Sequence, residues 1–241
     1  MIVALLVSLS TGCSKEENRS DNAQIRQLVD HVITAYGGRA ALQEITGYIA
    51  EGQLHAPHRN VLIRTTRWFQ RPDQLLLELA YSNQPEWRLT LGNQSWKGTS
   101  RSTLKPATGP VIWSMRLQTA RFDLPLRLLE VERELVLLKT DARGRTVLRH
   151  ELDKGLRMDY HIDPTTHYIV KMTMGMDGPP AMDFVADYSG FSEVGGVIFP
   201  HREVTWAGGT VTSKVVIDRI ILNPENLDQQ LLAPMGDFVS R

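Results

Sequence analysis

The sequence predicts a mainly β protein with a few helices, arranged as an antiparallel meander in one large domain. From Thr46 onward, most segments alternate apolar and polar side chains over about six to twelve residues, which is the period of a half-buried strand. Turn-forming residues separate successive segments at hairpin-like spacing. Only one strong helical pattern precedes these segments, so strands are expected to supply most of the core.

The first thirteen residues resemble the signal and lipidation site of a bacterial lipoprotein. The apolar run at residues 2–9 is too short to cross a bilayer core of about 30 Å but suits a signal peptide at residues 1–12. Three small residues then precede Cys13, the only cysteine, which would carry the lipid. Ser10 departs from the usual leucine or valine, and no Lys or Arg precedes the apolar run. An ordinary signal peptide followed by an incidental cysteine is the alternative.

Polar residues 13–22 predict a lipidated, flexible tether that leads to a single domain at residues 23–241. Lys and Arg number 27 and Asp and Glu number 27, so no global field favours a nucleic-acid partner. No block of like charge suggests a polybasic membrane patch. One cysteine cannot build a disulfide framework, so the core alone must stabilise the fold.

One amphipathic helix opens the domain. Its apolar residues recur at spacings of three and four, residues 20–22 offer N-cap oxygens, and Gly37 suits a left-handed C-cap. The apolar stripe is Ile25, Leu28, Val29, Val32, Ile33 and Tyr36. A short second helix is expected at residues 39–44.

Twelve segments then have the pattern of strands. They are residues 47–55, 60–70, 74–81, 86–91, 94–98, 134–140, 145–153, 156–163, 168–176, 181–189, 197–206 and 210–222. The interruption at residues 104–130 contains a predicted helix from Val111 to about Phe122, and Pro125 ends or kinks it.

Three consecutive strands near the C-terminus predict a sheet face that is apolar and rich in methionine. In residues 156–163, 168–176 and 181–189, apolar and polar side chains alternate, so hairpin pairing in register would gather the apolar sets on one side. A sheet core covered by helices explains this pattern. An apolar ligand site explains it as well, because unbranched thioethers adapt to variable ligands.

Several short motifs resemble the outer-membrane lipoprotein-sorting (LolA/LolB-like) superfamily. The first group is the helix end at residues 35–38 with Ala41, Leu42, Ile45 and Gly52 behind it; the second is the hairpin at residues 163–166. The third runs through residues 195–201 and 221–224 to Leu227 and Asp228. The matches lie in the expected order from about residue 25 to 234, and the middle third matches only in pattern.

The resemblance implies a strongly curved antiparallel sheet, an open half-barrel of about 10–11 strands, with helices packed in its concave mouth. It also implies binding of a lipid, a lipoprotein or another apolar ligand in the bacterial envelope. On the alternation of side chains, we expect methionine-bearing strands to form one wall of the cleft and the interrupting helix to form a cover. The candidate lining residues are Met158, Tyr160, Met172, Met174, Met176, Met182, Phe184, Trp113, Met115 and Phe122.

Enzymatic readings have weaker support. His55 and His58 have neither helical spacing nor a nearby third ligand, so we expect no metal site and no cofactor. His150 with Glu151, or Asp159 with His161, could exchange protons, but no nucleophile elbow or phosphate-binding loop accompanies them. Dispersed tryptophans at 68, 87, 96 and 206 favour sheet packing over a carbohydrate platform.

Two functions therefore remain open. The first is a membrane-anchored periplasmic lipoprotein that binds a ligand as an acceptor, sensor or assembly factor. The second is a non-enzymatic envelope scaffold that binds another envelope protein and whose helices fill its own cavity. Ser14 stands where aspartate would be the familiar inner-membrane retention signal, which favours the periplasmic face of the outer membrane.

Overall fold

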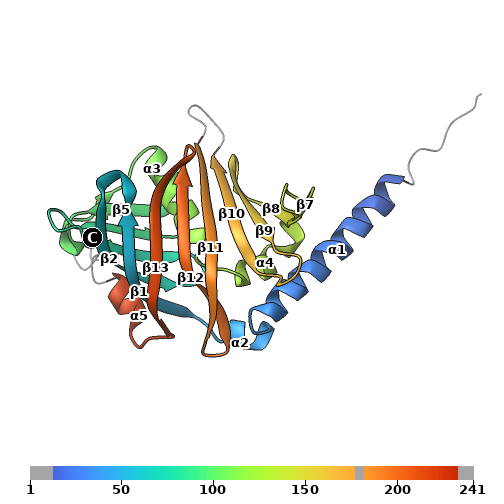
Figure 1. Cartoon of the computed structure of the whole chain (residues 1–241), viewed down its shortest axis with the longest axis horizontal. Coiled ribbons are helices and arrows are strands. Elements are labelled where there is room, and N and C mark those ends of the chain that lie inside the picture. The colour runs from blue at the N-terminus through green and yellow to red at the C-terminus, as the bar shows by residue number, and fades with distance from the viewer. Residues whose placement is uncertain (1–12, 177–181, 233–241) are drawn as a thin grey trace, which may run out of the picture.

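The computed structural model describes residues 13–176 and 182–232. The first two helices are α1 (Cys13–Ala35) and α2 (Arg39–Gln43), and both predicted helices are present. Because α1 begins at Cys13, residues 13–22, expected as a flexible tether, are helical here. No Gly or Pro occurs between residues 13 and 35, and Glu, Lys, Arg and Ala in this stretch favour a helix. Figure 1 shows the first turns of α1 extending away from the sheet.

All twelve predicted strands are present, and a two-residue strand adds a thirteenth. The strands are β1 (Gly47–Ala56), β2 (Val61–Gln70), β3 (Gln74–Leu79), β4 (Glu86–Leu91), β5 (Gln94–Gly98), β6 (Lys105–Pro106), β7 (Val136–Leu138), β8 (Thr146–Asp153), β9 (Leu156–Ile162), β10 (Ile169–Met176), β11 (Met182–Val194), β12 (Val197–Ala207) and β13 (Thr210–Leu222). The predicted fold class is confirmed, with two short edge strands that raise the count above the expected 10–11.

The strands form one antiparallel, unclosed sheet in the order β6-β5-β4-β3-β2-β1-β13-β12-β11-β10-β9-β8-β7. β1 pairs with β13, so the first and last strands lie side by side at the middle of the sheet. From Lys171 onward, β10 pairs in register with β9 and β11, so that Met158 faces Met174 and Met174 faces Phe184. This part of the register places the predicted apolar residues on one side of the sheet, as the alternation required. The register shifts between Ile169 and Lys171, and at that point Ile169, which breaks the predicted alternation, is the buried residue.

Helices α3 (Pro110–Ala120) and α4 (Leu126–Glu130) pack on the concave side of the curved sheet (Figure 1). The predicted helix thus ends at Ala120, and Pro125 precedes a separate short helix. Leu117, Leu126 and Leu128 belong to the main core together with the inward side chains of the strands. α1 lies against α4, β7 and the single turn η3 (Glu132–Glu134) at one end of the half-barrel.

A second, smaller core lies on the convex side under α5 (Leu227–Leu232), a helix the sequence pattern did not predict. Leu227 and Leu231 pack there with Leu76 and Leu89. Trp68 stacks on Trp87 at a centroid distance of 6.0 Å, and its indole N–H donates to Gln230 Oε1. Trp68, Trp87 and Trp96 therefore serve sheet packing, as expected. Trp206 instead borders the cavity on the other side of the sheet.

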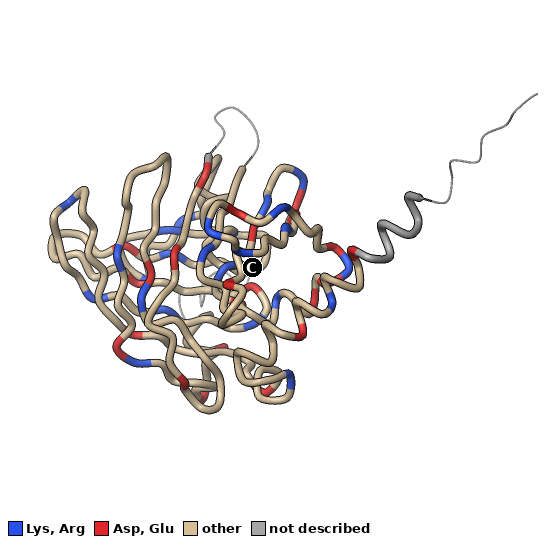
Figure 2. The backbone as a smooth tube through the Cα atoms, turned by 45° about the vertical axis from the view of Figure 1, so that its right-hand side comes forward, with Lys and Arg blue, Asp and Glu red and all other residues tan. Residues whose placement is uncertain are grey.

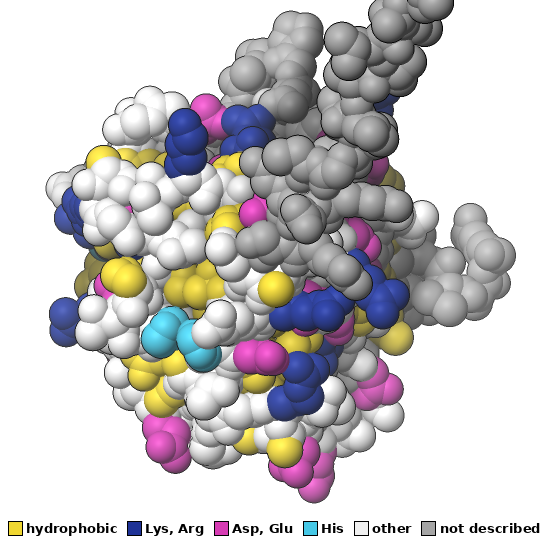
Figure 3. Space-filling model, turned by 90° about the vertical axis from the view of Figure 1, so that its right-hand side faces the viewer, with side chains coloured by type: hydrophobic (Ala, Val, Ile, Leu, Met, Phe, Trp, Pro, Cys, Tyr) yellow, Lys and Arg dark blue, Asp and Glu magenta, His cyan; other side chains and the backbone are white. Residues whose placement is uncertain are grey.

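Charged residues of both signs are spread along the described chain (Figure 2). Their side chains are intermixed on the face beside α1 (Figure 3). None of the described helices combines the length and the apolar character that a membrane crossing requires. The remaining single-turn helices are η1 (Pro57–Arg59) and η2 (Arg101–Thr103).

Candidate functional site

A cavity of 350 Å³ lies between α3 and the concave face of β1–β4 and β10–β13. Part of its wall is apolar and comes from inward positions of the strands and from α3: Leu54, Leu77, Leu79, Leu117, Phe184 and Val215. The rest is polar and includes four arginines, Arg59, Arg67, Arg88 and Arg121. The cavity therefore offers contact to a hydrocarbon and to a polar group at the same time.

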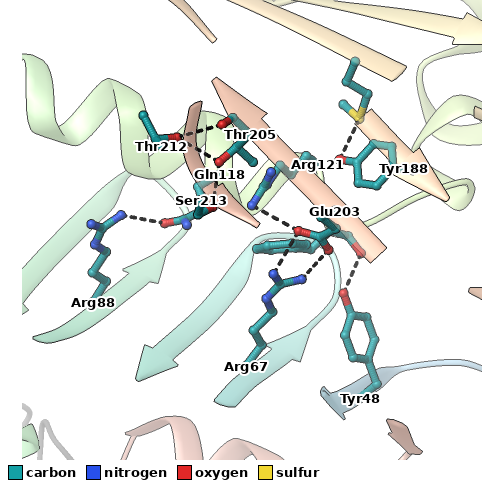
Figure 4. A network of polar contacts seen from close by, with 12 residues as sticks. Tyr48, Arg67, Arg88, Gln118, Arg121, Tyr188, Glu203, Thr205, Thr212 and Ser213 are labelled. Atoms are coloured by element: carbon teal, nitrogen blue, oxygen red, sulfur yellow. Dashed lines mark hydrogen bonds and ion pairs between the residues drawn. The ribbon is translucent and has the colours of Figure 1, made fainter. Parts of the chain in front are cut away.

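At the inner end of the cavity, two guanidinium groups share one buried carboxylate. Arg67 on β2 donates from both terminal nitrogens to Glu203 on β12, at 2.5 and 2.9 Å. Arg121, directly after α3, lies 3.5 Å from the second carboxylate oxygen. Figure 4 shows the two arginines approaching Glu203 from different elements. The side chains of Arg67, Arg121 and Glu203 are 5%, 7% and 4% exposed.

Burial and charge act in opposite directions on Glu203. Burial raises the pKa of the carboxyl, but the two guanidinium charges outweigh this effect and hold the pKa below its usual range. Both guanidinium groups also lie over the Phe122 ring, at 4.3 and 4.7 Å from its centroid. Glu203 is therefore ionised at neutral pH, and the cluster carries two positive charges against one negative charge.

Two tyrosines flank the cluster on the side away from the cavity mouth. The Tyr48 hydroxyl donates to the Phe122 carbonyl at 3.1 Å, and the Tyr188 hydroxyl lies 3.5 Å from Met172 Sδ. Burial raises the pKa of both phenols, so both stay neutral. Two water-sized hollows of 40 and 20 Å³ lie next to these residues: Tyr48 lines both, and Tyr188 lines the larger one.

A hydroxyl cluster and an ion pair complete the polar wall. Thr205 Oγ1 lies 2.7 Å from Ser213 Oγ and 2.9 Å from Thr212 Oγ1. The register of β12 and β13 shifts at this point, and the bulge brings two consecutive residues of β13 to the same side. Across the cavity, Arg88 donates to Glu86 at 2.7 Å. It also donates to Gln118 on α3 at 3.3 Å (Figure 4).

The structure brings only part of the predicted lining to this cavity. Met174 and Phe184 border it, and Phe122 borders the two smaller hollows. Met115, Met158, Tyr160 and Met172 are buried and border none of these hollows, because α3 and α4 pack directly over β8–β10.

The other candidates lie elsewhere. Met176 is half-buried, and Trp113 on α3 is 36% exposed. Met182 pairs with Met176 through its backbone, but its side chain lies outside the described residues. Cys13 begins α1, and its side chain and the predicted signal peptide at residues 1–12 also lie outside the described residues.

Sequence reasoning missed the arginine cluster although the strand pattern contained a signal for it. In β2 the inward set is Ile63, Thr65, Arg67 and Phe69, and in β12 it includes Phe199 and Glu203. A charged residue in an otherwise inward-facing set must have a partner or a function. Alternation alone could have identified Arg67 and Glu203 separately, but their pairing depends on the fold.

The acid and base pairs considered from the sequence have different partners. His150 lies 3.3 Å from Glu134, whereas His161 lies 2.8 Å from Asp141 and 3.1 Å from Thr173. Asp159 instead accepts two hydrogen bonds from Arg149. None of these pairs borders the 350 Å³ cavity. In the part of the chain that the structure describes, no group of three metal-ligating side chains occurs.

Comparison with solved structures identifies a LolA/LolB-like fold. The chain aligns with a DUF1329 family protein from Desulfovibrio piger (TM-score 0.56, 7% identity, 83% of this chain and 94% of that chain). It aligns with a domain described as outer membrane lipoprotein-sorting from Vibrio parahaemolyticus (0.52, 13%, 88% and 96%). A LolA superfamily protein from Nitrosomonas europaea also matches (0.54, 14%, 85% and 94%). No protein-family model and no curated protein matches the sequence.

Proposed function

We propose that this protein binds a lipid, a lipidated protein or another apolar ligand in the half-barrel cavity, without catalysing a reaction. The observation that carries this proposal is the 350 Å³ cavity between α3 and the concave sheet. Its volume falls within the range of about 300–1,000 Å³ that is usual for small-molecule sites. The apolar part of its wall can replace the hydrocarbon contacts that an acyl chain leaves in a membrane, about 0.8 kcal/mol per methylene.

The fold supports the same proposal. Two of the solved structures with this fold are described as an outer membrane lipoprotein-sorting domain and a LolA superfamily protein. By analogy with these two proteins, we propose that this chain also belongs to the bacterial envelope and binds a ligand of the same class. We further propose that Cys13 is lipidated and holds the protein at the periplasmic face of the outer membrane.

Ligand binding is tested by blocking the cavity from α3. Ser114 lines the cavity and is half-buried, so Ser114→Trp places an indole in the space that a ligand would occupy. We expect the wild-type chain to take up a fluorescent fatty acid, Ser114→Ala to bind it equally, and Ser114→Trp to bind it at least ten-fold more weakly. Absence of uptake by the wild type, at concentrations where a known carrier is loaded, would argue for the scaffold function instead.

The scaffold function has one specific observation in its favour. Beneath α4 the half-barrel is filled, and Leu128, Leu148 and Met158 there are completely buried. If the 350 Å³ cavity takes up no apolar probe, neither half of the interior binds a ligand. An envelope protein then becomes the expected partner.

Anchoring is tested on the protein extracted from its own cells. Native mass spectrometry should report an N-terminal mass increment of a diacylglyceryl-modified cysteine at Cys13, which Cys13→Ser removes. An unmodified residue 13 in membrane-extracted protein would contradict the anchor but leave the binding proposal intact.

A further inference from the structure

On the premise of the proposed function, we infer that the ligand of the 350 Å³ cavity carries an anionic group, a carboxylate or a phosphate, which Arg121 at the inner end of the cavity recognises. The apolar wall would hold the hydrocarbon part and the arginine cluster the head.

The charge balance of the cavity supports an anionic ligand. Four guanidinium groups border it, whereas one bordering carboxylate, Glu86, and the adjacent Glu203 oppose them. Arg88 is neutralised by Glu86, with two contacts at 2.7 Å. Arg67 takes both oxygens of Glu203. The positive charges of Arg59 and Arg121 therefore remain without full compensation.

Arg121 is the less satisfied member of the buried cluster. A guanidinium offers five N–H donors. Both carboxylate oxygens of Glu203 already accept hydrogen bonds from Arg67 in a bidentate contact. Arg121 lies at 3.5 Å from Glu203 and also interacts with Tyr188. Among the described residues, the buried Nε of Arg121 has no hydrogen-bond partner, and neither has the Nε of Arg67. The two arginines therefore differ in their terminal nitrogens, because only those of Arg67 hold Glu203 at close distance. A buried charge with unused donors costs stability, and a bound anion would remove this cost.

One other buried carboxylate lies near the cluster, and it is already paired with a different arginine. Asp123, two residues after Arg121, accepts a hydrogen bond from Arg71 at 2.6 Å. The excess positive charge at the inner end of the cavity is therefore not neutralised by this neighbour.

Arg59 defines a second, more exposed position. It borders the cavity from η1, lies 4.4 Å over the Tyr81 ring, and has no carboxylate partner in the described part of the chain. Because water solvates this guanidinium, an anion gains less there than at Arg121. We assign the ligand head to Arg121 and a weaker, steering role to Arg59.

The test compares probes with the same chain and different heads. Dodecanoate, dodecyl phosphate and dodecanol are titrated calorimetrically into the full chain. We expect both anions to bind at least ten-fold more tightly than the alcohol, and the stronger of the two identifies the source as a carboxylate or a phosphate. Arg121→Gln should reduce the preference to less than three-fold, and Arg59→Gln should retain most of it. Arg64→Gln, which changes an exposed arginine that does not border the cavity, is the matched control.

Each outcome bears on a different claim. Equal binding of dodecanol and the two anions overturns this inference while the proposed function stands. If none of the three probes binds, both fail. Loss of the preference in Arg59→Gln but not in Arg121→Gln overturns the assignment of the head to Arg121. If Arg121→Gln does not fold, as judged by circular dichroism, the wild-type ratio of dissociation constants still decides whether an anion is preferred.

Discussion

Glu203 holds two arginines together inside the half-barrel. Its carboxylate is contacted by Arg67 and Arg121, and all three side chains are buried. Removal of the only carboxylate in such a cluster leaves buried positive charges unopposed, which is far costlier than the loss of a surface ion pair.

We therefore expect Glu203→Gln to lower the free energy of unfolding by about 3–5 kcal/mol, measured by urea denaturation at pH 7. Glu193→Gln, an exposed glutamate on β11, is the control and should change it by less than about 0.5 kcal/mol. Because the pKa of Glu203 is held low, its contribution is present above the usual pKa and disappears as the pH falls. Equal stabilities of Glu203→Gln and wild type at pH 7 would contradict the cluster.

The contribution of Asp123 to stability depends on pH in the opposite direction to that of Glu203. Burial raises its pKa to about 6, and the hydrogen bond from Arg71 offsets only part of this effect. Between the usual value of about 3.9 and 6, the folded protein binds a proton that the unfolded chain does not, so stability decreases as the pH rises.

The unfolding free energy of the wild type relative to Asp123→Asn should therefore fall by on the order of 2 kcal/mol between pH 4 and pH 7. Urea denaturation of both proteins at several pH values measures this difference. A carboxyl ¹³C resonance that titrates near pH 6 in the wild type and is absent in Asp123→Asn would identify the group. A difference that is constant with pH would show that Asp123 keeps its ordinary pKa.

Among the elements, α5 shows what one short helix contributes. Leu231 is fully buried in the convex core, whereas the next residue, Leu232, is 43% exposed. Leu231→Ala should lower the unfolding free energy by about 2–5 kcal/mol, because it removes buried methyl groups and leaves a cavity. Leu232→Ala should have an effect below about 0.5 kcal/mol.

Urea denaturation followed by tryptophan fluorescence measures both changes, since Trp68 and Trp87 lie in the same convex core. If the two alanine variants unfold at the same urea concentration, α5 does not pack as described.

Element prediction succeeded wherever periodicity was long enough to read. Each of the twelve expected strands has a counterpart, since alternation and turn residues both mark it. β6 was not predicted, because a strand of two residues, one of them Pro106, is too short to show an alternation of side chains. α5 was not predicted either. Its six residues contain only two buried leucines, which is too short a pattern to distinguish a helix from a loop.

For the whole molecule, the half-barrel has two unlike halves. Helices and side chains fill the concave side at β8, β9 and most of β10. The side formed by β1–β4 and β11–β13 retains the cavity, which Met174 of β10 also borders. Alternation predicted which side chains of β9, β10 and β11 face inward, but not which element would cover them. The methionine wall was therefore located on the correct face, and the hollow lies mainly against other strands.

One continuous core nevertheless spans both halves, from Leu54 on β1 to Met158 on β9. We expect the chain to unfold in a single cooperative transition, with coincident urea curves by tryptophan fluorescence and far-ultraviolet circular dichroism. Most of the tryptophans lie on β2, β4, β5 and β12, so separate melting of the β7–β10 half would appear as two displaced curves. Such a displacement would contradict a shared core.

The two edge strands of the open sheet, β6 and β7, are its shortest strands. β6 spans two residues and β7 three, and Pro106 in β6 has no N–H to offer. A second copy of the chain therefore meets almost no ladder of free amides and carbonyls that it could continue. An unclosed sheet with such short edge strands can therefore reach a high local concentration without adding strands from one copy to the next.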